Sequence, residues 1–130
     1  MPKKRPIFLT LQAVYAIHSD QISTFGGTHG LRDQGLLESA IGQAEQTFFG
    51  TKDIYQAAAL YCISLAKNHA FLDGNKRTAA DVMLTFLLMN RIDPRMTQGQ
   101  LFEWALKVAM SEISRDQLAA LLKQHSKEIK

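Results

Sequence analysis

The fold of this chain is decided by residues 76–90, which read KRTAADVMLTFLLMN. Beyond the two cations at its start, the stretch places apolar residues on almost every side of a helix. A helix without a polar face is normally buried among other elements rather than packed on one side only. The sequence therefore predicts a central helix over residues 76–90, with the remainder of the chain packed around it.

The remaining helices are indicated by apolar residues that recur every three or four positions, each series preceded by a capping residue. The expected caps are Thr10, Asp33, Asp53, Thr97 and Ser114. The first of these helices is expected to fade at residues 19–21, the second to end at Gly50, and the third to carry His69 in its last turn. Asp93 and Pro94 are expected to break the chain after the central helix.

Strands and helices do not alternate along the chain, so the pattern predicts an all-α fold, a single compact bundle of about six helices. A chain of 130 residues has the size of one domain, which we expect to span residues 1–130. The single cysteine, Cys62, lies at helical spacing from apolar neighbours and is interpreted as a core residue. Since it has no partner for a disulfide, we expect a cytoplasmic location.

Composition argues against several functional classes. No uncharged apolar run is long enough to span a bilayer, and no apolar segment of a signal peptide follows the basic N-terminus. The net charge of +3 is compatible with a nucleic acid or an acidic partner but requires neither. Lys3, Lys4 and Arg5 are predicted to form a solvated tail. Because aromatic residues are not interleaved with basic ones, we expect no direct nucleic-acid binding.

A second informative stretch leads into the central helix: residues 69–77 read HAFLDGNKR. The first backbone N–H groups of a helix lack intrahelical partners and attract anions, and Lys76 and Arg77 add full positive charges there. Cations oppose the helix dipole at this end, so their placement makes sense if an anion binds. Gly74 permits a close approach of the backbone to that anion. The stretch therefore predicts a phosphate-binding site.

Three other residues of this stretch, His69, Phe71 and Asp73, have possible functional or structural roles. His69 can exchange a proton near neutral pH, and Asp73 offers oxygen ligands to a divalent cation. Each also has a structural interpretation, His69 as a core histidine and Asp73 as a helix cap or a surface charge. Phe71, between them, is predicted to anchor the loop in the core. The chain lacks an EF-hand, zinc-ligand spacing and a Walker loop.

Upstream, residues 22–30 contain three glycines and little periodicity. Glycines in such a stretch permit backbone conformations that other residues avoid. The sequence therefore predicts a loop or a short β-like flap over residues 22–30.

The run 69–77, continued by Thr78, resembles the signature motif of the Fic/Doc superfamily. The broad Fic pattern is His-Pro-Phe-x-Asp/Glu-Gly-Asn-Gly-Arg, from which this chain departs at Ala70 and Lys76. Both departures match the Doc (death-on-curing) branch, whose pattern is His-x-Phe-x-Asp/Asn-Ala/Gly-Asn-Lys-Arg. Residues 25–40 are also similar to the flap and the following helix of the family, so the resemblance covers most of the chain.

The resemblance assigns roles by matching position. It implies that His69 is the general base on a target hydroxyl and that Asp73 binds magnesium. It implies a phosphate cradle shaped or charged by Gly74, Asn75, Lys76 and Arg77. The flap that docks the target segment as an added strand would comprise Phe25, Gly26, Gly27 and Gly30.

The resemblance also implies an enzyme that uses ATP and Mg²⁺ to modify a protein hydroxyl. Doc toxins phosphorylate a threonine of elongation factor Tu and stop translation, whereas Fic proteins usually transfer AMP; Lys76, where Fic has glycine, favours phosphoryl transfer. The inhibitory pattern Ser/Thr-x-x-x-Glu-Gly/Asn of some Fic proteins is absent. The resemblance therefore implies restraint by a Phd-type antitoxin. A non-catalytic helical binding module is the alternative outside the enzymes.

Overall fold

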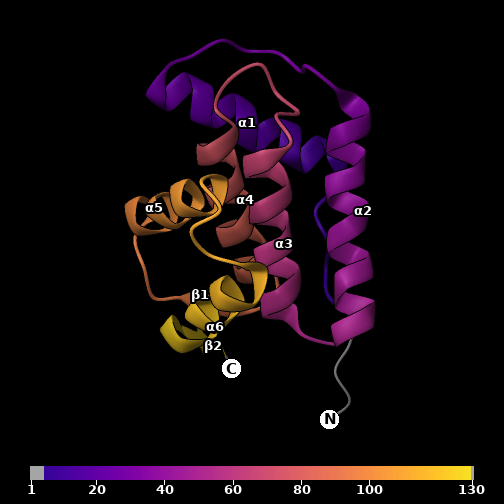
Figure 1. Cartoon of the computed structure of the whole chain (residues 1–130), viewed down its shortest axis with the longest axis vertical. Coiled ribbons are helices and arrows are strands. Elements are labelled where there is room, and N and C mark those ends of the chain that lie inside the picture. Colours follow the sequence, from indigo (N-terminus) through magenta and orange to yellow (C-terminus); the bar gives the residue numbers. More distant parts are fainter. Residues whose placement is uncertain (1–4, 130) are drawn as a thin grey trace.

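The computed structural model describes residues 5–129. In that part of the chain it contains six helices and one two-stranded sheet. The helices are α1 (Leu11–Phe25), α2 (Gln34–Thr51), α3 (Ile54–Lys67), α4 (Asn75–Met89), α5 (Gln98–Ala109) and α6 (Arg115–His125). The strands are β1 (Ile92–Pro94) and β2 (Ser126–Glu128). The predicted all-α fold is confirmed (Figure 1).

Helix α4 lies in the middle of the bundle, where it packs against α1, α3 and α5 (Figure 1). Helices α2 and α6 pack against α3. The central positions of α4 are fully buried: Val82, Met83, Phe86 and Leu87. The predicted central helix is therefore confirmed. Cys62 of α3 is also buried as predicted, and burial raises the pKa of its thiol to about 12, so a reactive thiolate is not available at neutral pH.

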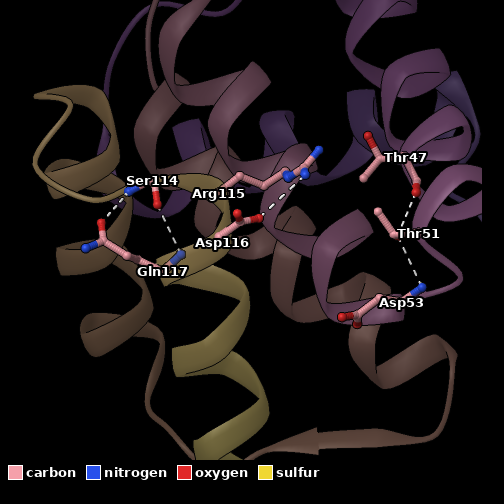
Figure 2. Close-up of polar contacts among 7 residues, drawn as sticks. All are labelled: Thr47, Thr51, Asp53, Ser114, Arg115, Asp116 and Gln117. Atoms are coloured by element: carbon pink, nitrogen blue, oxygen red, sulfur yellow. Dashed lines mark hydrogen bonds and ion pairs between the residues drawn. The ribbon is translucent and has the colours of Figure 1, made fainter.

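The five predicted capping residues begin helices in the structure. Each of the residues Thr10, Asp33, Asp53, Thr97 and Ser114 accepts a hydrogen bond from a backbone N–H of the helix that follows. Thr97 and Ser114 form capping boxes, in which a glutamine side chain accepts a bond from the N–H of the cap in return. Figure 2 shows the pair Ser114 and Gln117 and, separately, the bond from the Asp53 N–H to the Thr51 hydroxyl.

The predicted ends of α1 and α2 are wrong. Helix α1 does not fade at residues 19–21 but runs to Phe25. The polar Gln21 interrupts the apolar pattern of α1 in the sequence. In the structure it is nevertheless buried, and it donates a hydrogen bond to Asp81 of α4 at 2.8 Å. Gly50 does not end α2, which continues to Thr51 and is capped by Lys52 in the left-handed conformation at φ +57°.

The small sheet was not predicted. Strand β1 contains Asp93 and Pro94, which were expected only to break the chain, and it pairs antiparallel with β2. The register places Ile92 opposite Glu128 and Pro94 opposite Ser126. Strands of three residues are too short to show a period, and their pairing joins residues far apart in the sequence.

The remaining expectations concern the surface and the chain start. No helix in the described part of the chain is long and apolar enough to cross a membrane. Lys3 and Lys4 of the predicted tail lie outside the described residues. Arg5 is exposed as predicted, and its guanidinium carbon lies 5.0 Å from the ring centroid of Phe49.

Candidate active site

His69 lies just beyond helix α3. The prediction that it occupies the last turn is wrong, because α3 ends at Lys67 and His69 has a left-handed backbone with φ of +54°. The apolar pattern of α3 continues past the end of the helix, because Ala70 and Phe71 are buried although they lie in the following loop. The spacing of apolar residues therefore does not show where the helix ends. The side chain of His69 is exposed rather than packed in the core.

The loop that carries the motif, residues 68–74, is bonded to the flap, residues 26–31. We call these segments the motif loop and the flap. Leu31 and Phe71 form an isolated antiparallel bridge, and the Leu72 N–H donates to the Gly30 carbonyl at 3.0 Å. The loops between α1 and α2 and between α3 and α4 therefore meet at one end of the bundle (Figure 1). The flap contains no further strand structure, so the predicted β-like character is limited to this bridge.

Phe71 anchors the motif loop as predicted, since only 2% of its surface is exposed. Its ring stacks on the imidazole of His18, with centroids 3.8 Å apart and planes 7° from parallel. The Nε2 atom of His18 is 2.8 Å from the carbonyl oxygen of Asp73, and burial lowers the pKa of His18. Sequence reasoning assigned His18 no role, although its position four residues after the buried Val14 could have indicated one.

The buried His18 predicts how stability depends on pH. The unfolded chain takes up a proton at His18 near pH 6.5, whereas the folded protein takes it up only at lower pH. Protonation therefore favours the unfolded state, and the free energy of unfolding should fall as the pH drops below 6.5. Urea denaturation at several pH values should show this slope in the wild type. A smaller slope is expected in His18→Gln, and equal slopes would contradict the assignment to His18.

Asn75, at the start of α4, shapes the motif loop from inside. Its side chain is buried, and it bonds both backbone groups of Phe71: the Phe71 N–H donates to Oδ1 and Nδ2 donates to the Phe71 carbonyl, each at 3.0 Å. The predicted contribution of Asn75 to the cradle therefore has a structural basis that does not need contact with a ligand.

Asn75→Ala should lower the free energy of unfolding by about 2 kcal/mol or more, because two buried backbone groups lose their partners. Chemical denaturation followed by circular dichroism measures this loss. The neighbouring Lys76→Ala serves as the control and should change stability by less than ~0.5 kcal/mol. Unchanged stability in Asn75→Ala would show that its amide does not hold the loop.

Asp73 and the glycines form a tightly fitted corner. The Asp73 carboxylate accepts bonds from the Gly74 N–H at 2.9 Å and from the Thr28 N–H of the flap at 3.2 Å. A Cβ atom at Gly27 would lie 2.8 Å from Asp73 Oδ2, and one at Gly74 would lie 2.8 Å from the Cδ1 of Ile22. With φ of +123° and +75°, both glycines also adopt backbone conformations that other residues avoid. Only glycine therefore suits either position.

Helix α4 begins at this corner without a side-chain cap. Its N-cap is Gly74, so the first N–H groups of the helix remain available for an anion. Lys76 and Arg77 form no ion pair with a carboxylate within residues 5–129. The beginning of α4 thus combines free donors with two unneutralised cations, which is the arrangement predicted for a phosphate site.

Most of the predicted site residues line one cleft of about 210 Å³. Its lining consists of Phe25, Gly26, Asp73, Gly74, Asn75, Lys76, Arg77 and Phe102. Three predicted site residues are not part of this lining: His69, Gly27 and Gly30. Gly27 faces Asp73, while Gly30 approaches the side chain of Leu72.

Arg77 is held between two aromatic rings at the wall of this cleft. Its guanidinium carbon lies 4.0 Å from the ring centroid of Phe25 and 4.1 Å from that of Phe102. Phe25 is therefore the last residue of α1 and a support for Arg77, rather than part of the flap. Phe102, on α5, was missed by sequence reasoning, because its place on an ordinary amphipathic helix gives no local signal.

A second cleft of about 270 Å³ lies on the other side of these stacked side chains. It shares Phe25, Arg77 and Phe102 with the first cleft and adds three polar residues, Gln21, Asp81 and Gln98. The two clefts therefore share the Arg77 stack as a common wall.

The residues present also fit a magnesium nucleotide. No group of three or more His, Cys, Asp or Glu side chains suited to a metal occurs in the part of the chain that the structure describes. Mg²⁺ nevertheless needs few protein ligands, since it keeps waters and shares the phosphate oxygens of a nucleotide. One exposed carboxylate, Asp73, beside the uncapped start of α4 is a donor set of this kind.

Comparisons with known proteins agree with this geometry. A family model described as the Fic/DOC family matches residues 8–87, which include the flap and the motif loop. The protein kinase doc of Escherichia phage P1 is 32% identical over 115 residues, 87% of this chain and 90% of that protein. The toxin Doc of Mycolicibacterium smegmatis is 42% identical over 71 residues, 52% of this chain and 55% of that protein. The chain belongs to the Fic/Doc family and, within it, is related to the Doc toxins.

Proposed function

We propose that this protein is the toxin of a toxin–antitoxin pair and that it transfers the γ-phosphate of ATP to a protein hydroxyl. The proposed acceptor is a threonine of a translation protein such as elongation factor Tu, and the consequence is arrest of protein synthesis. The names of the two relatives, a protein kinase and a toxin, support this class of function.

One observation carries the proposal: Lys76 lies beside the uncapped start of α4, in the same cleft as Asp73 and next to the loop that presents His69. Phosphoryl transfer requires mainly that the phosphates be positioned and their charge stabilised. Lys76 and the free N–H groups supply that charge, and Arg77 adds a second cation at the cleft wall. Asp73 would hold Mg²⁺, which when bound neutralises charge on the phosphates.

In the proposed reaction, His69 accepts the proton of the attacking hydroxyl. The hydroxyl oxygen forms a bond to the γ-phosphorus, the bond from that phosphorus to the β–γ bridging oxygen breaks, and ADP leaves. The exposed side chain of His69 on the motif loop can reach a protein substrate that docks against the flap. The flap would receive the target segment as an added strand next to Leu31.

We further propose that a Phd-type antitoxin restrains the enzyme, because the chain contains no inhibitory motif of its own.

Intact-protein mass spectrometry tests the proposed reaction. Elongation factor Tu incubated with this protein, ATP and Mg²⁺ should gain ~80 Da, the mass of one phosphate. A gain of ~329 Da would identify AMP transfer, the Fic-type reaction, and would contradict the proposed kinase activity. No gain at all would contradict the proposed target.

A further inference from the structure

The backbone of His69 is in a conformation that a residue with a Cβ atom avoids. Its φ of +54° lies in the left-handed region, where Cβ crowds the following carbonyl. Lys52, Arg91 and Ser111 adopt the same conformation just past the ends of α2, α4 and α5, so it is a way in which this chain leaves a helix. At His69 the bonds that hold this turn also fix the backbone from which the imidazole projects.

Those interactions converge on Arg32, which follows the flap. Its Nε atom donates to the carbonyl of His69 at 2.6 Å, and its Nη2 atom donates to the carbonyl of Asn68 at 3.1 Å. The guanidinium thus bonds the carbonyls of two successive residues just beyond the end of α3. Within residues 5–129, Arg32 forms no ion pair with a carboxylate, so these carbonyls are the partners of its charge.

Arg32 is itself fixed to the scaffold. Its backbone N–H and that of Asp33 both donate to the Ala70 carbonyl, at 2.8 and 2.9 Å. Asp33 caps α2 through a bond from the Leu36 N–H, so the backbone of Arg32 is tied to a helix that packs on α3. The carbonyls of residues 68–70 are therefore all bonded to the segment that begins α2.

We propose that Arg32 is a positioning residue for His69: its guanidinium fixes the left-handed turn and so aims the imidazole at the acceptor hydroxyl. The proposal rests on the proposed function, in which His69 is the base. The planar fork of arginine can bond two carbonyls at once, whereas the single ammonium of lysine cannot reproduce that geometry. Small errors in the placement of a reacting group are costly, so loss of the fork should lower kcat.

Two variants of Arg32 distinguish the effect of its two hydrogen bonds from the effect of its positive charge. Arg32→Gln removes the fork and the charge, and Arg32→Lys removes only the fork. Arg95→Gln is the matched control, since Arg95 pairs with Asp93 on β1 and does not contact the motif loop. In the transfer assay, both Arg32 variants should lose about tenfold or more in kcat, while the KM for ATP stays within about twofold of wild type. Arg95→Gln should match the wild type.

A second measurement does not depend on activity. Nuclear magnetic resonance should show a change in the Cα and Cβ chemical shifts of His69, which report its backbone conformation, in both Arg32 variants. Amide exchange should also become faster at Ala70, whose N–H donates to Oδ1 of Asn68 at 3.2 Å within the same turn. Unchanged His69 shifts and Ala70 exchange in Arg32→Gln would overturn the proposal. Wild-type kcat in Arg32→Lys would also overturn it, because the charge alone would then suffice.

The two measurements keep this inference separate from the proposed function. If the wild type transfers nothing to elongation factor Tu, the proposed target fails, and the resonance data still decide whether Arg32 holds His69. If the wild type is active and the Arg32 variants retain its kcat, the positioning role fails while the proposed function stands.

Discussion

Replacing His69 with alanine should lower phosphate transfer at least about a hundredfold, because the acceptor hydroxyl loses its general base. Stability should change by less than ~0.5 kcal/mol, since the side chain of His69 is exposed and alanine meets the same backbone restriction at φ +54°. The rate of transfer is measured by mass spectrometry and the free energy of unfolding by urea denaturation, on the same preparation.

The matched control is His125→Ala. His125 is an exposed histidine at the end of α6, where its Nδ1 atom lies 2.9 Å from the carbonyl of Leu121, remote from the motif loop in the sequence. This variant should transfer phosphate at the wild-type rate. If His69→Ala were as active as His125→Ala, His69 would not be the general base. Either another residue would accept the proton of the hydroxyl, or the protein would be a non-catalytic binding module.

Asp73→Asn should have the second large effect, a loss of about a hundredfold or more in transfer rate at low Mg²⁺ concentration. The substitution removes the one carboxylate of the cleft that is placed to bind the ion and nearly preserves the shape of the side chain. The Gly74 and Thr28 N–H groups bond to different oxygens of the carboxylate, so the single amide oxygen of asparagine can keep only one of these bonds in place.

Dependence on Mg²⁺ separates the metal role of Asp73 from its bonds to the flap. If Asp73 binds the ion, the transfer rate of Asp73→Asn should recover in part as Mg²⁺ is raised, whereas that of His69→Ala should not. Asp116→Asn, on α6, is the charge-matched control and should follow the wild-type curve. A defect in Asp73→Asn that is independent of Mg²⁺ would assign Asp73 a purely structural role.

The sequence predicted well those features of the fold that depend on residues close to one another in the chain. The capping residues are examples: Thr97 and Ser114 bond to N–H groups three residues ahead, so their role depends only on near neighbours. The central helix was predictable for a related reason, since residues such as Val82 and Phe86 make α4 apolar on nearly every side. The residues predicted to bind phosphate, Gly74 to Arg77, are likewise adjacent in the sequence.

Contacts between distant segments were the part that the sequence could not predict. Just beyond the end of α3, the carbonyls of Asn68 and His69 accept bonds from Arg32, which precedes α2 in the sequence. Gln21 looked like a loop residue because the partner that it bonds, Asp81, is on α4. Phe102 supports Arg77 from α5, and nothing in the sequence around it distinguishes it from a core aromatic residue.

The central claim is that the terminal phosphate of ATP, rather than AMP, is joined to the acceptor protein. The most direct test uses two samples of ATP, one radiolabelled at the γ-phosphorus and one at the α-phosphorus, each incubated with this protein, Mg²⁺ and elongation factor Tu. We expect label from the γ-position alone to become attached to the factor, and His69→Ala to attach none. Label from the α-position on the factor would contradict the claim and would identify an AMP transferase.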